Sequence, residues 1–171
     1  MRSSNIVIVG NAIPKEDYSE FIESHDIVIR FNHVNFLHTK KLGNKCDILV
    51  VQNMDSSYRE GKATFDKWEK LIIIAENEVK DYSALIINSN NWKTRNIETI
   101  YSDNLPVREK LNNGGSSGFI ILEWLLNSKK EDLIFPISLV CFTWQGWEGH
   151  AWEQEKKICH EYQKLGLVDI V

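Results

Sequence analysis

Short runs of apolar, mostly β-branched residues recur along the chain and alternate with stretches of helical spacing. The first run, NIVIVGN at residues 5–11, passes into a turn through a glycine, which is typical of a buried parallel strand. A helical stretch at 14–25 and a second apolar run, DIVIRFN at 26–32, follow directly. Strand, helix and strand in this order predict a right-handed crossover and a parallel sheet. The pattern therefore restricts the chain to the α/β class.

The same alternation continues to the end of the sequence. Further strands are expected at 45–53, 71–77, 84–90 and 137–144, and further helices at 61–70, 106–111, 119–130 and 151–166. Residues 91–104 are polar and poorly periodic, which predicts an irregular, mobile connection over a site. We expect a single Rossmann-like domain over residues 1–171, with a mostly parallel central sheet flanked by helices.

Composition limits the functions that such a domain can have. Its 171 residues suffice to bury roughly 70% of the unfolded surface without a metal or a disulfide. Because 24 acidic residues face 20 basic ones, the sequence offers no basic face for nucleic acid. Three widely spaced cysteines without a C-x-x-C predict neither a disulfide framework nor a zinc site, and they favour a reducing cytoplasm.

Membrane insertion is not expected either. No apolar run reaches the roughly 18 residues that a spanning helix needs. The first strand begins near residue 5, so we expect no signal peptide. The prediction is a cytoplasmic protein without an intrinsic membrane span, which leaves peripheral membrane association open. The sequence indicates no particular oligomeric state.

Asparagines stand at the carboxyl ends of three predicted strands: Asn11, Asn32 and Asn53. Ligands of open α/β sheets bind at this edge, and an amide suits phosphate oxygens and the edges of a pyrimidine or ribose. For any one asparagine, a helix cap or a turn is an equally good explanation. Gly10 stands alone, without the G-x-G-x-x-G fingerprint, and no P-loop sequence occurs, so dinucleotide and nucleoside triphosphate sites are disfavoured.

The segment NNGGSSG at 112–118 is a more specific signal. Its glycines free the backbone, Ser116 and Ser117 supply hydroxyls, and a helix that is apolar nearly all round follows at once. Unpaired N–H groups and the positive end of the helix dipole would then point at one place, which predicts an anion site. The alternative is an ordinary serine N-cap on a buried helix.

His150 precedes the last predicted helix, in QGWEGHAWEQE. A helix N-terminus disfavours the imidazolium, which would leave a neutral ring able to act as a general base. A surface or hydrogen-bonded loop histidine is the plainer alternative. Glu155 follows five positions later, about 140° around a helix. We expect Glu155 to cap the first turn of its own helix and so fix the loop that holds His150.

No metal site is expected. The other histidines have no H-x-x-x-H or H-E-x-x-H spacing, and no D-x-D pair is present to bridge a diphosphate through a divalent cation. Trp144, Trp147 and Trp152 flank His150. Tryptophans are more often core residues, although one beside a catalytic histidine is a natural face for a sugar ring.

Three of these segments, taken together, resemble the motifs of the sialyltransferases, which transfer sialic acid from CMP-sialic acid to a sugar hydroxyl. HDIVIRFNHV…LGNKCDILVVQN resembles the long motif, NNGGSSGFIILEWLL the short motif with glycines in place of prolines, and HAWEQE the small H-x-x-x-x-E motif. The similarity covers residues 9–155 in matching order and spacing. VGNAIPKEDYSE also resembles the opening of the other bacterial sialyltransferase family.

The resemblance implies a Rossmann-like α/β fold and an inverting transfer that needs neither a metal nor a cofactor. By analogy Asn11 and Asn32 would bind the CMP phosphate and ribose, and His150 would take the proton of a glycan acceptor. The resemblance also implies that the nucleotide or the donor carboxylate is bound by Asn113, Ser116, Ser117 and Gly118. Supporting roles around the site would fall to Gly10, Arg30, Asn53 and Glu155.

The departures from the animal enzymes bear on function. The short-motif helix lacks their cysteine and we expect no membrane anchor, and the resemblance then implies a bacterial-type enzyme of surface polysaccharide synthesis. At 171 residues the chain is short for the family, so its acceptor-binding elements are reduced. A non-catalytic nucleotide- or glycan-binding module derived from the fold is therefore the alternative. An unrelated enzyme pairing His150 with Ser117 is disfavoured, because Ser117 is not the central serine of a G-x-S-x-G elbow.

Overall fold

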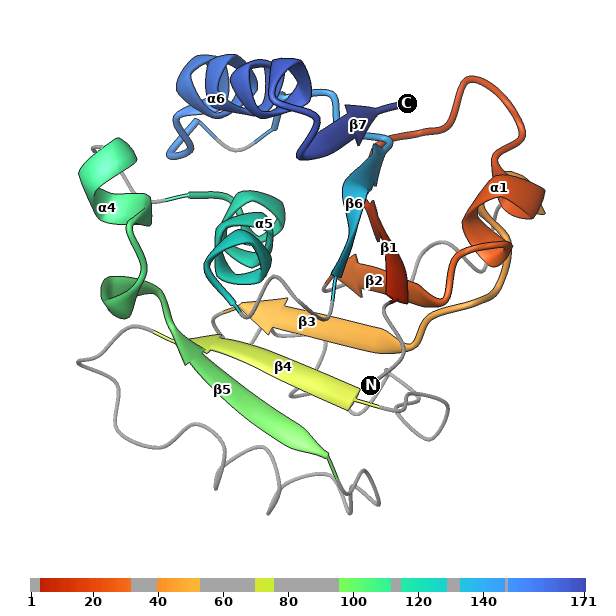
Figure 1. Cartoon of the computed structure of the whole chain (residues 1–171), viewed down its shortest axis with the longest axis horizontal. Helices are drawn as coiled ribbons and strands as arrows, with labels where there is room; N and C mark the ends of the chain where they lie inside the picture. Colours follow the sequence, from red (N-terminus) through yellow and green to blue (C-terminus); the bar gives the residue numbers. More distant parts are fainter. Residues whose placement is uncertain are drawn as a thin grey trace.

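One sheet of parallel strands forms the centre of the molecule in the computed structural model (Figure 1). The structure describes residues 4–31, 40–52, 70–75, 96–111, 115–128, 133–146 and 148–171. Its strands are β1 (Ser4–Val9), β2 (Ile27–Phe31), β3 (Ile48–Gln52), β4 (Lys70–Ala75), β5 (Ile97–Tyr101), β6 (Leu133–Val140) and β7 (Val168–Ile170). All six pairings between them are parallel. The predicted α/β fold with a parallel central sheet is confirmed.

The strand order contains a topological switch point beside β1. Across the sheet the strands follow β5-β4-β3-β2-β1-β6-β7. The chain thus proceeds outward from β1 to β5 and then returns to place β6 on the other side of β1. Connections on the two sides of β1 diverge at the carboxyl ends of β1 and β6, and this is where open α/β sheets bind ligands.

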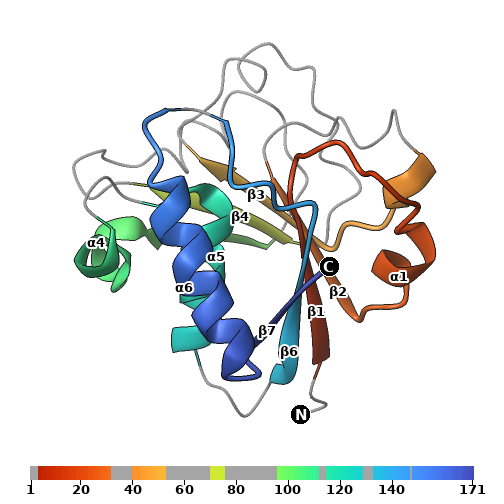
Figure 2. The same cartoon turned by 90° about the horizontal axis from the view of Figure 1, so that it is seen from above.

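Alternation along each strand divides the core into two layers. In β1, Ile6 and Ile8 face one layer, and Val7 and Val9 face the other. The first layer packs against α4 (Val107–Lys110), α5 (Ser117–Asn127) and α6 (Trp152–Lys164), and the second against α1 (Ser19–Glu23) and the 3₁₀ turn η2 (Lys40–Leu42). Figure 2 shows α5 and α6 together, away from α1. β-branched residues on both faces of a strand are needed because both faces are covered.

Helix α5 carries most of the first layer. Eight of its eleven residues are buried, as predicted for a helix that is apolar nearly all round. It begins at Ser117, two residues before the predicted 119–130, because the Ser116 side chain caps it by accepting from the Phe119 N–H. The serine N-cap, which was the alternative explanation of this segment, is therefore present, and it lies at the carboxyl edge of the sheet.

Helix α1 is shorter than the predicted 14–25. The Asp17 carboxylate accepts hydrogen bonds from both the backbone N–H and the hydroxyl of Ser19, at 2.9 and 2.6 Å. This local turn competes with helical hydrogen bonding, so the helix starts only at Ser19. The residues from Gly10 to Tyr18 instead form an irregular loop beside the end of β1.

The prediction of an irregular connection over 91–104 is wrong for its second half. Residues 97–101 form strand β5, which pairs with β4 along its whole length. Ile100 is buried, and Glu98, two positions earlier on the same face, contacts Lys70 of β4 as an ion pair. Half-exposed edge strands carry polar residues, which weakens their sequence signal. The same holds for β7, a three-residue edge strand that the sequence pattern did not indicate.

Strand β6 lies four residues upstream of the predicted 137–144. It pairs with β1 from Leu133 onward and ends at Val140. Cys141 and Trp144 have φ angles of +60° and +49°, which no strand residue can adopt. Residues 61–69 of the helix predicted over 61–70, and the strand predicted over 84–90, lie outside the described residues. Lys70, placed in that helix, is the first residue of β4.

Candidate functional site

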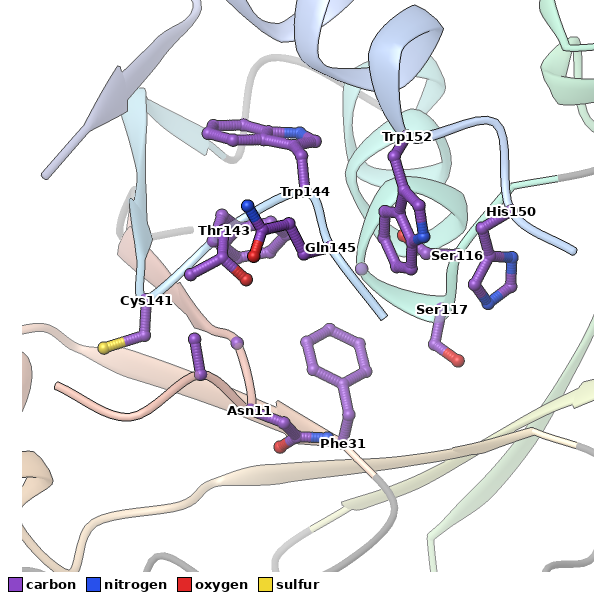
Figure 3. A pocket seen from close by; sticks show the side chains of 14 residues that line it. Asn11, Phe31, Ser116, Ser117, Cys141, Thr143, Trp144, Gln145, His150 and Trp152 are labelled. Carbon is purple, nitrogen blue, oxygen red and sulfur yellow. The ribbon is translucent and has the colours of Figure 1, made fainter. Parts of the chain in front are cut away.

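A pocket of about 280 Å³ opens at the switch point of the sheet (Figure 3). It is bounded by the end of β1, the end of β2, the start of α5, the loop after β6 and the start of α6. Its lining comprises Gly10, Asn11, Ala12, Phe31, Ser116, Ser117, Gly118, Cys141, Phe142, Thr143, Trp144, Gln145, His150 and Trp152. Six of the predicted site residues therefore share one pocket, although they come from three separate segments.

Gly10 and Asn11 occupy the turn that follows β1. The Gly10 N–H continues the sheet by donating to the Val140 carbonyl at 2.8 Å. A Cβ at position 10 would clash with the Cys141 carbonyl oxygen, so only glycine allows the two strand ends to approach this closely. Asn11 is exposed beside this contact and lines the pocket, as predicted.

The loop after β6 forms the wall opposite the start of α5. Its two residues with positive φ, Cys141 and Trp144, are not glycines, and such conformations cost about 1–3 kcal/mol each. The Trp144 ring lies 5.8 Å from the His160 ring of α6, and the Phe142 ring lies 6.1 Å from Trp144. These aromatic contacts hold the loop in its strained course and present an apolar surface to the pocket.

The start of α5 is held by a carboxylate from another helix. Glu155, in the first turn of α6, accepts from the Ser116 N–H and from the Ser116 hydroxyl, both at 2.7 Å. Glu155 is 2% exposed. The expectation that Glu155 caps its own helix is therefore wrong, because its carboxylate accepts both hydrogen bonds from Ser116 at the start of α5 instead. It still connects the two segments that carry the predicted ligand-binding serines and His150.

Two backbone donors at the start of α5 remain for a ligand. The Ser116 N–H is taken by Glu155, and the Phe119 N–H by the Ser116 side chain. The N–H groups of Ser117 and Gly118 have no acceptor among the described residues. Both residues line the pocket. Such N–H groups at the positive end of an eleven-residue helix make a site for an anion.

His150 lies one residue before the N-cap of α6 and reaches the same pocket. Its ring packs edge-on against Trp152, with 4.8 Å between ring centroids. Burial lowers the pKa of His150 below its ordinary value of 6.5. The ring is therefore neutral at neutral pH and able to accept a proton, as the sequence predicts for a residue at this place, although burial supplies the cause.

A second, more open hollow of about 660 Å³ adjoins the pocket on the α6 side. It shares Trp144, Gln145, His150 and Trp152 with the first pocket and adds the exposed Glu153 and Gln154. His150 thus stands where two cavities meet. Such an arrangement suits a reaction in which two molecules approach one base from different sides.

The remaining predicted residues divide into two groups. Arg30 does not line the pocket; it is 2% exposed and donates to the carbonyls of Lys45 and Leu42 at 2.8 and 2.6 Å. Its support is structural, because it ties β2 to the segment that leads into β3. Asn32, Asn53 and Asn113 lie outside the described residues, so their predicted roles stay predictions.

Gln52 is a site residue that sequence reasoning missed. It ends β3, one position before the predicted Asn53, and its Oε1 accepts a 2.6 Å hydrogen bond from the Ser117 hydroxyl. The sequence did offer a signal for Gln52, because a polar side chain at the carboxyl end of a strand can reach a ligand site. The next residue, Asn53, fits the same criterion and was chosen in its place. Phe31 and Phe142, which line the pocket, were not predicted as site residues, because an apolar residue near a strand end is expected in the hydrophobic core.

Within the described ranges, no three His, Cys, Asp or Glu side chains gather where they could hold a metal ion. In the same ranges, every helix is too short or too polar to cross a bilayer. Cys46, Cys141 and Cys159 form no disulfide with one another.

No protein-family model matches the chain, and no curated protein sequence matches it significantly. Solved structures do match it. A mammalian sialyltransferase in complex with Gal-β-1-3GalNAc-ortho-nitrophenol superposes with a TM-score of 0.67 at 15% identity, covering 99% of this chain and 69% of that one. The sialyltransferase CstII from Campylobacter jejuni, in complex with the substrate analogue CMP-3FNeuAc, gives a TM-score of 0.63 at 15% identity, covering 98% and 80%.

The chain has a sialyltransferase-like fold. A further CstII structure, in complex with CMP, matches with a TM-score of 0.61 over 97% of this chain. The resemblance stated from three sequence motifs is thus matched at the level of the fold.

Proposed function

We propose that this protein is a glycosyltransferase that moves a sialic-acid-like sugar from a CMP-sugar donor to a glycan hydroxyl, with inversion at the sugar carbon. One observation carries the proposal: the Ser117 and Gly118 N–H groups, unpaired within the described ranges, and the neutral ring of His150 line one pocket. The N–H groups suit a leaving phosphate, and the ring suits an acceptor hydroxyl. Many reactions need an anion site and a base. The sialyltransferase-like fold is the reason to propose a CMP-sugar as the donor and a glycan hydroxyl as the acceptor.

The donor would occupy the smaller pocket with its phosphate at the start of α5. The helix dipole and the two N–H groups stabilise the charge that grows on the phosphate as the sugar leaves. The amide of Asn11 lines the same pocket and can donate to a phosphate oxygen. Asn32 and Asn113 are proposed as further donor contacts. Because fixed backbone donors take the charge, the proposed transfer requires no metal and no cofactor.

The acceptor would enter through the larger hollow beside α6. His150 accepts the proton of the attacking hydroxyl as that oxygen bonds to the sugar carbon, while CMP departs on the opposite face. Holding both substrates in line supplies much of the rate, and the base contributes a further factor of about 10²–10⁴. Trp144 and Trp152 border both cavities and offer flat faces to sugar rings.

The decisive experiment is a calorimetric titration with CMP in the presence of EDTA, with CDP, UDP and NAD as comparison ligands. CMP is expected to bind and the others to bind at least tenfold more weakly. His150→Ala should retain CMP affinity within about twofold and lose release of CMP from CMP-sialic acid. Lys157→Ala, a change at an exposed position of α6, is the matched control and should keep that activity.

Two outcomes would contradict the proposal in different ways. If CMP produced neither heat nor a thermal shift at millimolar concentration, the nucleotide assignment would be wrong. If CMP bound tightly but CMP-sialic acid was never turned over with a broad acceptor panel, the protein would be a non-catalytic binding module. The chain spans 69% and 80% of the lengths of the two superposed enzymes, which is the observation that favours this second function.

A further inference from the structure

The larger hollow beside α6, of about 660 Å³, is negatively charged where the structure describes its wall. Its described lining consists of two tryptophans, two glutamines, a glycine, an alanine, His150 and Glu153. Because burial lowers the pKa of His150 below 6.5, this ring is neutral at pH 7. Among the described residues of the lining there is no lysine and no arginine. The charge of the described wall is therefore that of the Glu153 carboxylate.

The Glu153 carboxylate is not neutralised by its surroundings. Glu153 is exposed in the first turn of α6, and it forms no ion pair with another described residue. Lys156 and Lys157 follow on the same helix, outside the described lining of the hollow. An acidic residue in a first turn also interacts favourably with the helix dipole. That interaction leaves the negative charge in place, so a molecule that enters the hollow still meets it.

The remaining groups of the hollow suit an uncharged sugar. Trp144 and Trp152 offer aromatic rings against which a sugar can pack (Figure 3). The amides of Gln145 and Gln154 can donate to hydroxyl groups and accept from them, and the Glu153 carboxylate can accept from them. A sugar that bears a carboxylate needs a cation instead, and like charges at short range are repelled. The described wall of the hollow therefore favours neutral sugars over acidic ones.

This preference bears on the acceptor, which enters the hollow in the proposed function. Building on that function, we propose that Glu153 restricts the acceptor to glycans whose terminal sugar bears no carboxylate. The consequence extends to the product. A sialic-acid-like sugar carries a carboxylate, so after one transfer the glycan ends in an acidic sugar, which the same charge rejects. The protein therefore caps a neutral glycan with one acidic sugar and does not extend it into a polymer.

A panel of acceptors tests the substrate class. Transfer from CMP-sialic acid by the full chain is measured to neutral galactosides, glucosides and N-acetylhexosaminides, each beside its sialylated counterpart. Neutral glycosides should accept the sugar, and sialylated ones should accept it at least about tenfold more slowly. Mass spectrometry should find one added sugar per acceptor even when the donor is in excess.

A pair of competitors isolates the charge. The uronic acid derivative of the accepted neutral sugar and the primary amide of that derivative have the same shape and differ by one negative charge. As inhibitors of transfer, the amide should compete at least about tenfold better than the acid. Glu153→Gln should reduce this ratio about fivefold, whereas Glu153→Asp, which keeps the charge, should retain most of it. Added salt should lower the ratio in the wild type and leave it nearly unchanged in Glu153→Gln, since salt screens an exposed charge.

Glu161→Gln is the matched control. It makes the same substitution at another exposed position of α6, outside the described lining of both cavities. It should leave the ratio of the two competitors unchanged. Thermal unfolding establishes that each variant is folded. If Glu153 acted on the helix dipole alone, Glu153→Gln would change stability, or both competitors equally, and not their ratio.

The results separate this inference from the proposed function. The inference would be overturned if Glu153→Gln left the ratio unchanged, if sialylated acceptors were used as well as neutral ones, or if the products formed a ladder of added sugars. It would also be overturned if CMP were released from CMP-sialic acid without transfer to any neutral acceptor. In each of these cases CMP binding stands. Failure of the unmodified protein to bind CMP would remove the proposed function and this inference together.

Discussion

Among single residues, one carboxylate links the parts of the candidate site. Glu155 lies in the first turn of α6, the helix that follows His150. Its two carboxylate oxygens accept hydrogen bonds from the N–H and the hydroxyl of Ser116 at the start of α5. Burial raises the pKa of the Glu155 carboxyl above its ordinary value of 4.5, and the hydrogen bonds from Ser116 offset part of that rise. A buried carboxylate is tolerated here because charged hydrogen bonds satisfy it.

Loss of the Glu155 carboxylate should destabilise the fold. Glu155→Ala leaves the buried Ser116 N–H without an acceptor and should lower the free energy of unfolding by about 2–4 kcal/mol. Glu155→Gln keeps one acceptor oxygen and should cost less than half as much. Urea unfolding at pH 7 measures both changes. An alanine variant as stable as the glutamine variant would show that the two hydrogen bonds contribute little.

The stability difference between the wild type and Glu155→Gln is expected to depend on pH. Because the folded pKa of Glu155 is raised, its contribution to stability is fully present below the unfolded pKa and is lost as pH rises through the folded pKa. The stability of the wild type relative to Glu155→Gln should therefore be greater at pH 4 than at pH 7. Because both proteins contain the same other carboxyl groups, the contributions of those groups to the pH dependence of stability cancel in the comparison. A relative stability that increased with pH would mean that the folded pKa is lowered instead.

His150 should set the acid limb of the transfer reaction. Its neutral form is the proposed base, and burial lowers its pKa below 6.5. We expect kcat/KM to rise with pH, to inflect below pH 6.5 and then to remain level to about pH 8. Initial rates of CMP release across this acid-to-neutral range provide the measurement. An inflection well above the ordinary histidine pKa would exclude His150, in this environment, as the group that titrates.

Among the helices and strands, the start of α5 is fixed by close packing as well as by hydrogen bonds. A Cβ at Gly118 would lie 2.7 and 2.9 Å from two atoms of the Phe142 ring. Further along, Glu123 of α5, fully buried, accepts from Lys110 of α4 at 2.6 Å and from Tyr162 of α6 at 2.5 Å. Glu123 thus ties together the three helices over this face of the sheet, two of which, α5 and α6, begin at the pocket.

Gly118→Ala should disturb the pocket by displacing Phe142. The added methyl group forces the ring to shift, so we expect a loss of about 1–3 kcal/mol in unfolding free energy and weaker CMP binding. Phe142→Leu provides room for the methyl group. The double variant should therefore be more stable than the sum of the two single changes predicts, which a double-mutant cycle by urea unfolding will measure. Additive effects would contradict direct contact between the two side chains.

In the molecule as a whole, the two core layers share every central strand. Val7 and Ile8 of β1 are both fully buried, one in each layer, so neither layer can lose its packing without exposing the other side of the same strand. A sheet of this kind is expected to unfold as a unit. The single-domain prediction for residues 1–171 therefore implies one cooperative transition.

Two independent signals can test that cooperativity. Far-UV circular dichroism follows the helices and strands, and tryptophan fluorescence includes the signals of Trp144 and Trp152 at the pocket. The two urea curves should coincide, and a saturating concentration of CMP should shift both to the same extent. A fluorescence transition that preceded the loss of secondary structure would show that the site unfolds separately from the sheet.

Much of this architecture is predictable because buried parallel strands need apolar, β-branched residues on both faces. On that ground the strands predicted at 5–11, 26–32 and 45–53 lie within three residues of β1, β2 and β3. Edge strands β5 and β7 escape the prediction, since exposed faces carry polar residues. The end of β6 is predicted too late because Cys141 and Trp144 adopt positive φ angles, and the contact that holds Trp144, with His160 of α6, comes from a distant segment.

Local pattern was sufficient for the fold class, the serine cap on α5 and the position of His150 ahead of the last helix, because each depends on neighbours a few residues away. How these parts meet depends instead on contacts between distant segments. Glu155 pairs with Ser116 across 39 positions and Gln52 with Ser117 across 65. Hydrogen bonds over such separations leave no local signal, since they form when the folded sheet brings the carboxyl ends of distant strands to one edge.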